Sequence, residues 1–192
     1  MPDILILTLL KLVDIKPLTV EYIIKNYMII AVIGASKANE KLVKLATEVG
    51  FELGRNGITI VCGGLGGVME AACKGSKQAG GVTIGILPGN DPEAANEFVD
   101  IPICTGLGYA RNVIIVKTGL SVIAVGGAYG TLSEIGHALG DNIPVIGLKT
   151  WSFNQDNMDK TLFTPAIDPS EAVDLAIKAA IIKDELSKSR EL

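Results

Sequence analysis

Residues 58–69 read Ile58-Thr59-Ile60-Val61-Cys62-Gly63-Gly64-Leu65-Gly66-Gly67-Val68-Met69. A run rich in β-branched residues leads here into a glycine-rich turn, and apolar residues at helical spacing follow the turn. This order predicts a strand over residues 58–62 and a helix over residues 67–79. A strand, a tight turn and a helix in succession are typical of α/β proteins.

The same alternation continues along the chain from residue 28. Strands are expected at residues 29–33, 58–62, 82–87, 98–101, 121–125 and 144–148. Helices are expected at residues 39–55, 67–79, 109–118 and 131–140. The strand segments show no polar alternation, so we expect them to be buried on both faces, as in a parallel sheet covered by helices on each side. The predicted fold class is therefore α/β, with a Rossmann-like doubly wound parallel sheet.

The length of 192 residues suits one hydrophobic core, so a single domain is expected over residues 28–192. Residues 1–27 do not share the alternating pattern and are interpreted as an N-terminal extension. They are either a mis-assigned start preceding Met28 or an arm that docks through Leu9, Leu12 and Val13. A last helix is expected after Asp168, which can cap it, with Pro169 at its first position and Glu171 three residues after the cap.

The composition argues against several classes of protein. The net charge of -4 and pI near 5.1 disfavour a general nucleic-acid-binding surface. The apolar stretch at residues 4–13 is interrupted by Lys11 and too short for a membrane span, so no membrane anchoring is expected. Cys62, Cys73 and Cys104 lack metal-binding spacing and are expected to be buried thiols in a reducing cytoplasm, with no metal site.

Ligands of open parallel sheets bind beyond the carboxyl ends of the strands, where helix N-termini also point. Glycine in the turns at this edge permits positive φ and lets backbone N–H groups approach an anion. The residues expected to bind phosphate or nucleotide are Gly34, Ser36, Gly63, Gly64, Gly66, Gly67, Met69, Gly127, Gly130 and Thr131. The alternative is that the glycines only close short loops and permit tight packing. The chain has no G-x-x-x-x-G-K-[ST] motif and no G-x-G-x-x-G after its first strand, which disfavours a P-loop NTPase or an ordinary NAD dehydrogenase.

Three motifs occur in one characteristic order. They are Gly63-Gly64-Leu65-Gly66-Gly67-Val68-Met69, then Arg111, then Gly126-Gly127-Ala128-Tyr129-Gly130-Thr131-Leu132-Ser133-Glu134. This order resembles the LOG family, formerly labelled "possible lysine decarboxylase", over residues 28–148. The last motif is similar to the family's P-G-G-x-G-T-x-x-E, with Gly126 at the proline, and Asn112 stands where plant-type members usually have lysine. The sequence of this motif looks closer to a sub-branch of the superfamily that includes molybdenum cofactor carrier proteins.

The resemblance implies a nucleotide-binding protein that is a homodimer or a higher homo-oligomer. Characterised LOG enzymes cleave the N-glycosidic bond of nucleoside 5′-monophosphates, releasing base and ribose 5-phosphate, and by resemblance Arg111 and Glu134 stand at the catalytic positions. The sub-branch implies the alternative, a non-catalytic carrier or sensor of a phosphorylated ligand such as molybdenum cofactor or a nucleotide. The expected partner is thus a phosphorylated small molecule, bound as phosphate, nucleotide or a molybdopterin-type compound, with no cofactor required.

The two charged residues also have a reading independent of any family. The carboxylate of Glu134 can stabilise positive charge on a ribose and orient water. The alternative is a purely structural role, as an acid in the first turn that complements the helix dipole. The forked guanidinium of Arg111 can clamp phosphate or ribose oxygens, whereas its alternative is a surface salt bridge. Lys117 and Lys149 lack a recognisable pyridoxal-phosphate context, so lysine decarboxylation is not expected.

Overall fold

The computed structural model of the chain describes residues 28–153 and 161–188. The extension predicted at residues 1–27 lies outside the described residues. The predicted homo-oligomer stays a prediction.

The centre of the fold is a parallel sheet of seven strands. Its order is β4-β3-β2-β1-β5-β6-β7. The strands are β1 (Ile29–Gly34), β2 (Thr59–Cys62), β3 (Thr83–Leu87), β4 (Ile101–Cys104), β5 (Ser121–Val125), β6 (Val145–Leu148) and β7 (Phe163–Ala166). The chain builds outward from β1 to β4 and then returns to place β5 against the free side of β1. The strand order therefore reverses between β1 and β5, and parallel sheets bind ligands at such a point.

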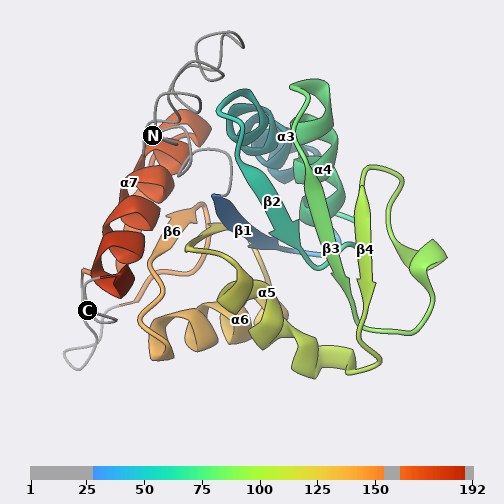
Figure 1. Ribbon diagram of the computed structural model, residues 1–192. Helices are drawn as coiled ribbons and strands as arrows, with labels where there is room; N and C mark the ends of the chain where they lie inside the picture. The colour runs from blue at the N-terminus through green and yellow to red at the C-terminus, as the bar shows by residue number, and fades with distance from the viewer. Residues whose placement is uncertain (1–27, 154–160, 189–192) are drawn as a thin grey trace, which may run out of the picture.

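Helices cover both faces of the sheet (Figure 1). On one face lie α3 (Glu40–Arg55), α4 (Val68–Gln78) and α7 (Pro169–Lys188), and on the other α5 (Asn112–Thr118) and α6 (Tyr129–Gly140). Successive residues of β1 alternate between two cores: Ile30 and Val32 pack under the first group, Ala31 and Ile33 under the second. This arrangement confirms the predicted doubly wound α/β fold.

Two glycines allow α3 and α4 to pack closely. A Cβ atom added to Gly50 would lie 1.9 Å from the carbonyl oxygen of Ala72, and one added to Gly75 would lie 2.0 Å from the carbonyl oxygen of Thr47. Since backbone atoms occupy these positions, a larger residue would force the helices apart. The glycines at this contact have a packing role.

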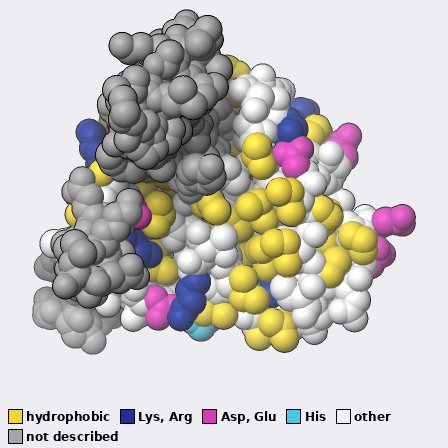
Figure 2. Space-filling view, viewed as in Figure 1, with side chains coloured by type: hydrophobic (Ala, Val, Ile, Leu, Met, Phe, Trp, Pro, Cys, Tyr) yellow, Lys and Arg dark blue, Asp and Glu magenta, His cyan; other side chains and the backbone are white. Residues whose placement is uncertain are grey.

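The strand predicted at residues 98–101 is wrong, because the edge strand β4 begins at Ile101. Before it, Asp100 accepts hydrogen bonds from Lys77 Nζ at 2.7 Å and from the Thr83 amide at 2.9 Å. The side chains of β4 are exposed rather than buried on both faces, and hydrophobic side chains gather on the surface on this side of the molecule (Figure 2). The other edge strand, β7, was not predicted, since it has four residues and contains Pro165.

Local signals at the helix ends had mixed outcomes. The predicted cap of α7 is confirmed, because Asp168 Oδ1 accepts a hydrogen bond from the Glu171 amide at 2.9 Å. The helix predicted from residue 109 instead begins with a 3-10 turn, η2 (Gly108–Arg111), and becomes α-helical at Asn112. Another 3-10 turn, η1 (Pro92–Ala94), follows β3.

The prediction of buried cysteines holds for Cys62 and Cys73 and is wrong for Cys104, which is exposed at the end of β4. An edge strand leaves its side chains open to solvent, which the sequence pattern did not reveal. None of the helices in the described residues is long and apolar enough to cross a membrane.

Candidate functional site

The turns after β1, β2, β3 and β5 leave the sheet at one edge, because all these strands run in the same direction. At this edge Gly34 is in register with Val125, so the ends of β1 and β5 lie side by side. A Cβ atom on Gly34 would lie 2.5 Å from the carbonyl oxygen of Val125. Gly34 thus keeps the two strand ends close at the point where the strand order reverses.

The first glycine turn, residues 62–67, connects β2 to α4. Gly64 and Gly67 have φ angles of 71° and 70°, which residues other than glycine rarely adopt. A Cβ atom on Gly67 would lie 2.3 Å from the carbonyl oxygen of Ala35, and the Val68 amide donates to that oxygen at 2.9 Å. The first glycine turn therefore packs directly against the turn that contains Ser36.

Asn96 braces the first glycine turn from the loop after β3. Its side-chain Nδ2 donates to the carbonyl oxygens of Gly64 and Leu65 at 3.1 and 2.9 Å. Its backbone N–H also donates to the Gly64 carbonyl oxygen, at 2.9 Å. Each bond holds a carbonyl of the turn in place, so the turn is shaped before any ligand binds.

The second glycine turn, residues 126–130, connects β5 to α6. Gly126 and Gly127 have φ angles of 57° and 119°. The segment after β6 holds this turn: the Thr150 hydroxyl donates to the Gly126 carbonyl, and Trp151 Nε1 donates to the Ala128 carbonyl at 3.3 Å. The second glycine turn is therefore also fixed by contacts from outside it.

The helices that follow the two turns lack side-chain caps. The N-terminus of α4 at Gly67 and that of α6 at Ala128 carry no side-chain hydrogen bond. By contrast, Asn39 Oδ1 caps α3 by accepting from the Leu42 amide at 3.0 Å, and Asp168 caps α7. First-turn N–H groups need an acceptor. In α4 the Val68 amide already donates to the Ala35 carbonyl oxygen, so the remaining first-turn N–H groups of α4 and those of α6 are available to an anion.

Arg111 and Glu134 form an ion pair beside the first glycine turn. Arg111 Nη1 lies 3.6 Å from Glu134 Oε1, and each residue is 7% exposed. Arg111 Nη1 also donates to the Asn112 side-chain oxygen. A Cβ atom on Gly63 would lie 2.6 Å from Arg111 Nη2, so the guanidinium lies directly against this glycine. Within the described part of the chain, the buried Arg111 Nε has no hydrogen-bond acceptor.

Burial changes the protonation of this pair. Removal from water raises the pKa of Glu134 to about 7, although the nearby Arg111 cation opposes the rise. Burial also lowers the pKa of Arg111, against the opposing effect of Glu134. Glu134 therefore exchanges its proton near neutral pH.

The residues predicted to bind phosphate lie around both glycine turns. Ser36 and Gly67 line a cavity of about 610 Å³, together with Glu70 and Lys74. At the other end of the turn, Met69 packs beneath Gly63, with its Sδ 2.7 Å from the position of a Cβ there. On the second glycine turn, Thr131 is buried against Gly127 whereas Gly130 faces open space.

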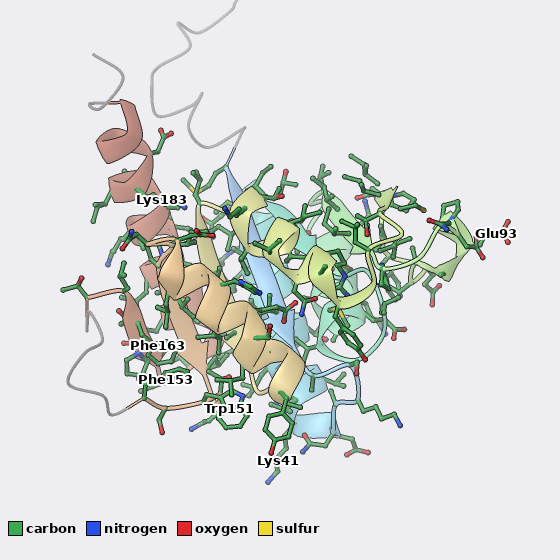
Figure 3. All side chains as sticks on the ribbon, turned by 90° about the horizontal axis from the view of Figure 1, so that it is seen from below. Lys41, Glu93, Trp151, Phe153, Phe163 and Lys183 are labelled. Carbon is green, nitrogen blue, oxygen red and sulfur yellow. The ribbon has the colours of Figure 1, made fainter. Side chains whose placement is uncertain are left out.

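A larger cavity of about 760 Å³ lies at the opposite end of the sheet. It is lined by Asn142 and Thr161, which precede β6 and β7, and by Lys178 and Lys183 of α7. Figure 3 shows Lys183 far from Trp151, which marks the edge that carries the glycine turns. No predicted site residue lines this cavity.

Three residues that shape the site were not predicted: Asn96, Thr150 and Trp151. Thr150 and Trp151 lie two and three residues after a predicted strand that ends at the ligand-binding edge, which was a usable signal. Asn96 gave none, since its bonds depend on how the loop after β3 folds. Within the described residues, His, Cys, Asp and Glu form no group of three or more suited to a metal ion.

Residues 27–177 match the model of the SLOG cluster4 family. The chain belongs to this family. The match covers β1 to β7, both glycine turns, Arg111 and Glu134. The LOG-like membership expected from the motifs is thus confirmed.

Two curated relatives are similar in sequence. An uncharacterized protein of Archaeoglobus fulgidus is 47% identical over 64% of this chain and 80% of its own length. A cytokinin riboside 5′-monophosphate phosphoribohydrolase of Mycobacterium tuberculosis is 31% identical over 61% of this chain and 67% of its own.

Solved structures of molybdenum cofactor proteins share the fold. The molybdenum cofactor binding protein of Rippkaea orientalis has a TM-score of 0.73 and 37% identity, covering 80% of this chain and 97% of that protein. The molybdenum cofactor carrier protein of Chlamydomonas reinhardtii has a TM-score of 0.72 and 36% identity, covering 81% and 98%. DNA processing protein A of Helicobacter pylori, at 18% identity, a TM-score of 0.60 and coverage of 80% and 81%, shares the fold alone.

Proposed function

We propose that this protein binds and carries a phosphorylated small molecule of the molybdenum cofactor type at the edge formed by the two glycine turns. The observation that carries the proposal is the absence of side-chain caps on α4 and α6, the two helices that start at these turns. The first-turn N–H groups other than that of Val68, together with the positive dipole ends of the two helices, favour a phosphate as their acceptor.

The charges around the turns support the same ligand. The Arg111 guanidinium lies against Gly63 and supplies a buried positive charge. Because Glu134 is half protonated near its pKa of about 7, it neutralises that charge only in part. Arg111 thus retains part of its positive charge for a phosphate monoester.

The phosphate end of molybdenum cofactor fits this arrangement. Gly130 faces open space and Gly66 has only ordinary contacts, so a phosphate could approach the backbone at both turns. The similarity to the molybdenum cofactor proteins of Rippkaea orientalis and Chlamydomonas reinhardtii supports the larger ligand. The cofactor is the cargo in this proposal, and no reaction step is assigned to it.

A charge placed on the first glycine turn tests binding. Gly66→Asp adds a carboxylate where a Cβ atom is tolerated, its nearest neighbour being Glu70 Oε2 at 3.6 Å, and Gly66→Asn adds the same shape without charge. In calorimetric titrations with ribose 5-phosphate, we expect Asp to weaken binding by about tenfold or more relative to Asn. Equal affinities of the two variants for ribose 5-phosphate would mean that the phosphate does not bind at this turn. A molybdopterin-type ligand retained through purification and identified by mass spectrometry would support the carrier role.

A second candidate function is hydrolysis of the N-glycosidic bond of a nucleoside 5′-monophosphate. The observation in its favour is the buried Arg111–Glu134 pair with a carboxyl pKa of about 7, which suits a group that takes and returns a proton. The named activity of the Mycobacterium tuberculosis relative supports it. Incubation with AMP, GMP and CMP, followed by chromatography for free base, separates the candidates. Base release that Glu134→Gln abolishes favours the hydrolase, whereas no release above that variant leaves the carrier.

A further inference from the structure

An exposed tyrosine ring and a half-buried tryptophan ring lie together at the second glycine turn. Tyr129 is the first residue of α6, follows Ala128 directly and is 81% exposed. Its ring centroid lies 6.0 Å from that of Trp151, with the ring planes tilted by 39°. The pair is therefore part of the edge at which the proposed function places the phosphate.

A hydrogen bond from Trp151 to the backbone fixes the position of the pair. Trp151 Nε1 donates to the Ala128 carbonyl at 3.3 Å, which ties the indole to the turn that carries Tyr129. Figure 3 shows Phe153 and Phe163 on the same side of the molecule as Trp151, and their own rings pack edge to face with centroids 5.1 Å apart. The indole in the segment after β6 is thus held in one position.

Scattered apolar side chains on a surface need no special explanation. This pair differs because it is hydrogen-bonded to a glycine turn and adjoins an uncapped helix N-terminus. Aromatic faces stack on flat heterocycles, and such stacking tolerates different bases because every base has a π face. An aromatic side chain next to a phosphate site can therefore stack on a ring of the ligand whose phosphate binds there.

We propose that Tyr129 and Trp151 form a stacking platform for a planar heteroaromatic ring of the ligand whose phosphate binds the glycine turns. This inference rests on the proposed function and specifies its ligand class: a phosphate monoester that bears a flat ring of purine or pterin size. Ribose 5-phosphate, which has no such ring, then binds through its phosphate and sugar alone.

The test compares ligands with and without the ring in the full chain. The probes are ribose 5-phosphate, GMP and 6-hydroxymethylpterin monophosphate, and the proteins are the unmodified chain, Tyr129→Ala and Tyr129→Phe. By calorimetry we expect Tyr129→Ala to weaken binding of one or both ring-bearing probes by about tenfold and to leave ribose 5-phosphate unchanged. Tyr129→Phe keeps the ring and should retain the affinity. The probe that responds identifies the ring as purine or pterin.

Fluorescence supplies an independent readout, because Trp151 is the only tryptophan of the chain. GMP at saturation should change its emission, and ribose 5-phosphate should not. If Tyr129→Ala weakens all bound probes equally, or none of them, the platform is wrong while phosphate binding stands. If none of the probes binds the unmodified chain, both the platform and the proposed function fail.

Discussion

Arg111 Nη1 lies 3.6 Å from Glu134 Oε1, and both side chains are buried beside the first glycine turn. The two residues come from segments that follow different strands, η2 after β4 and α6 after β5. Burial of opposite charges stabilises a fold little in itself, but removal of one partner leaves the other charge uncompensated. The pair is thus a sensitive point for the stability of the protein.

The first prediction concerns the loss of one partner. At pH 9, where Glu134 is ionised beside its cation, Arg111→Met should lower the free energy of unfolding by about 3 kcal/mol, because it leaves Glu134 buried without that cation. The double variant Arg111→Met/Glu134→Gln should recover most of this loss, since no charge then remains to desolvate. Urea denaturation of the unmodified chain, Arg111→Met, Glu134→Gln and the double variant measures the coupling. Additive effects of the two substitutions would mean that the residues do not interact.

The second prediction concerns pH. The pKa of Glu134 is raised to about 7 in the folded protein, above its ordinary value of 4.5, so the folded state binds more protons between these values. Stability should therefore fall as pH rises from about 5 to 7, by on the order of 1 kcal/mol per pH unit from this group. Glu134→Gln removes the titration. The difference in unfolding free energy between the two proteins, followed across this pH range, should slope accordingly, and a flat difference contradicts the raised pKa.

The third prediction separates packing glycines from replaceable ones. Gly50→Ala should destabilise the protein by about 2 kcal/mol or more, because its Cβ would lie 1.9 Å from the Ala72 carbonyl oxygen. Gly136→Ala is the matched control: it also lies within a helix, and its Cβ would meet open space. It should stabilise by about 0.5–1 kcal/mol. Thermal unfolding measures both, and similar shifts for the two would refute close packing of α3 on α4.

The fourth prediction concerns Lys149, which follows β6 with a φ of 52°. A lysine in the left-handed region costs about 1 kcal/mol, and asparagine adopts this conformation more readily. Lys149→Asn should therefore raise the melting temperature by about 2–4 °C. Lys37→Asn, at an exposed lysine without positive φ, serves as control and should leave it within about 2 °C. A loss of stability in Lys149→Asn would mean that the lysine side chain makes a stabilising contact.

The sequence predicted the central strands well and the edges poorly. The strands β1, β5 and β6 are buried, and continuous apolar runs signal such strands directly. The edge strand β4 has exposed side chains, and its start depends on how Asp100 bonds to Thr83, a contact across 17 residues. The other edge strand, β7, is short and contains a proline, which a propensity argument rejects.

For the site, the sequence predicted which edge of the sheet carries the glycine turns but not how the turns are held. The parallel order of β1, β2 and β5 was sufficient to bring both turns to one edge. The contact of Arg111 with Gly63 joins η2 to the turn after β2, two segments far apart in the chain, and no local pattern encodes it. The braces at Asn96 and Thr150 likewise depend on tertiary contacts.

The most direct test is the position of the phosphate in a crystal structure of the full chain with bound GMP. The proposed site places the phosphate oxygens within about 3 Å of backbone amides of Gly66 or Thr131, at the N-termini of α4 and α6. Phosphate density in the cavity lined by Lys178 and Lys183, at the opposite end of the sheet, would contradict it.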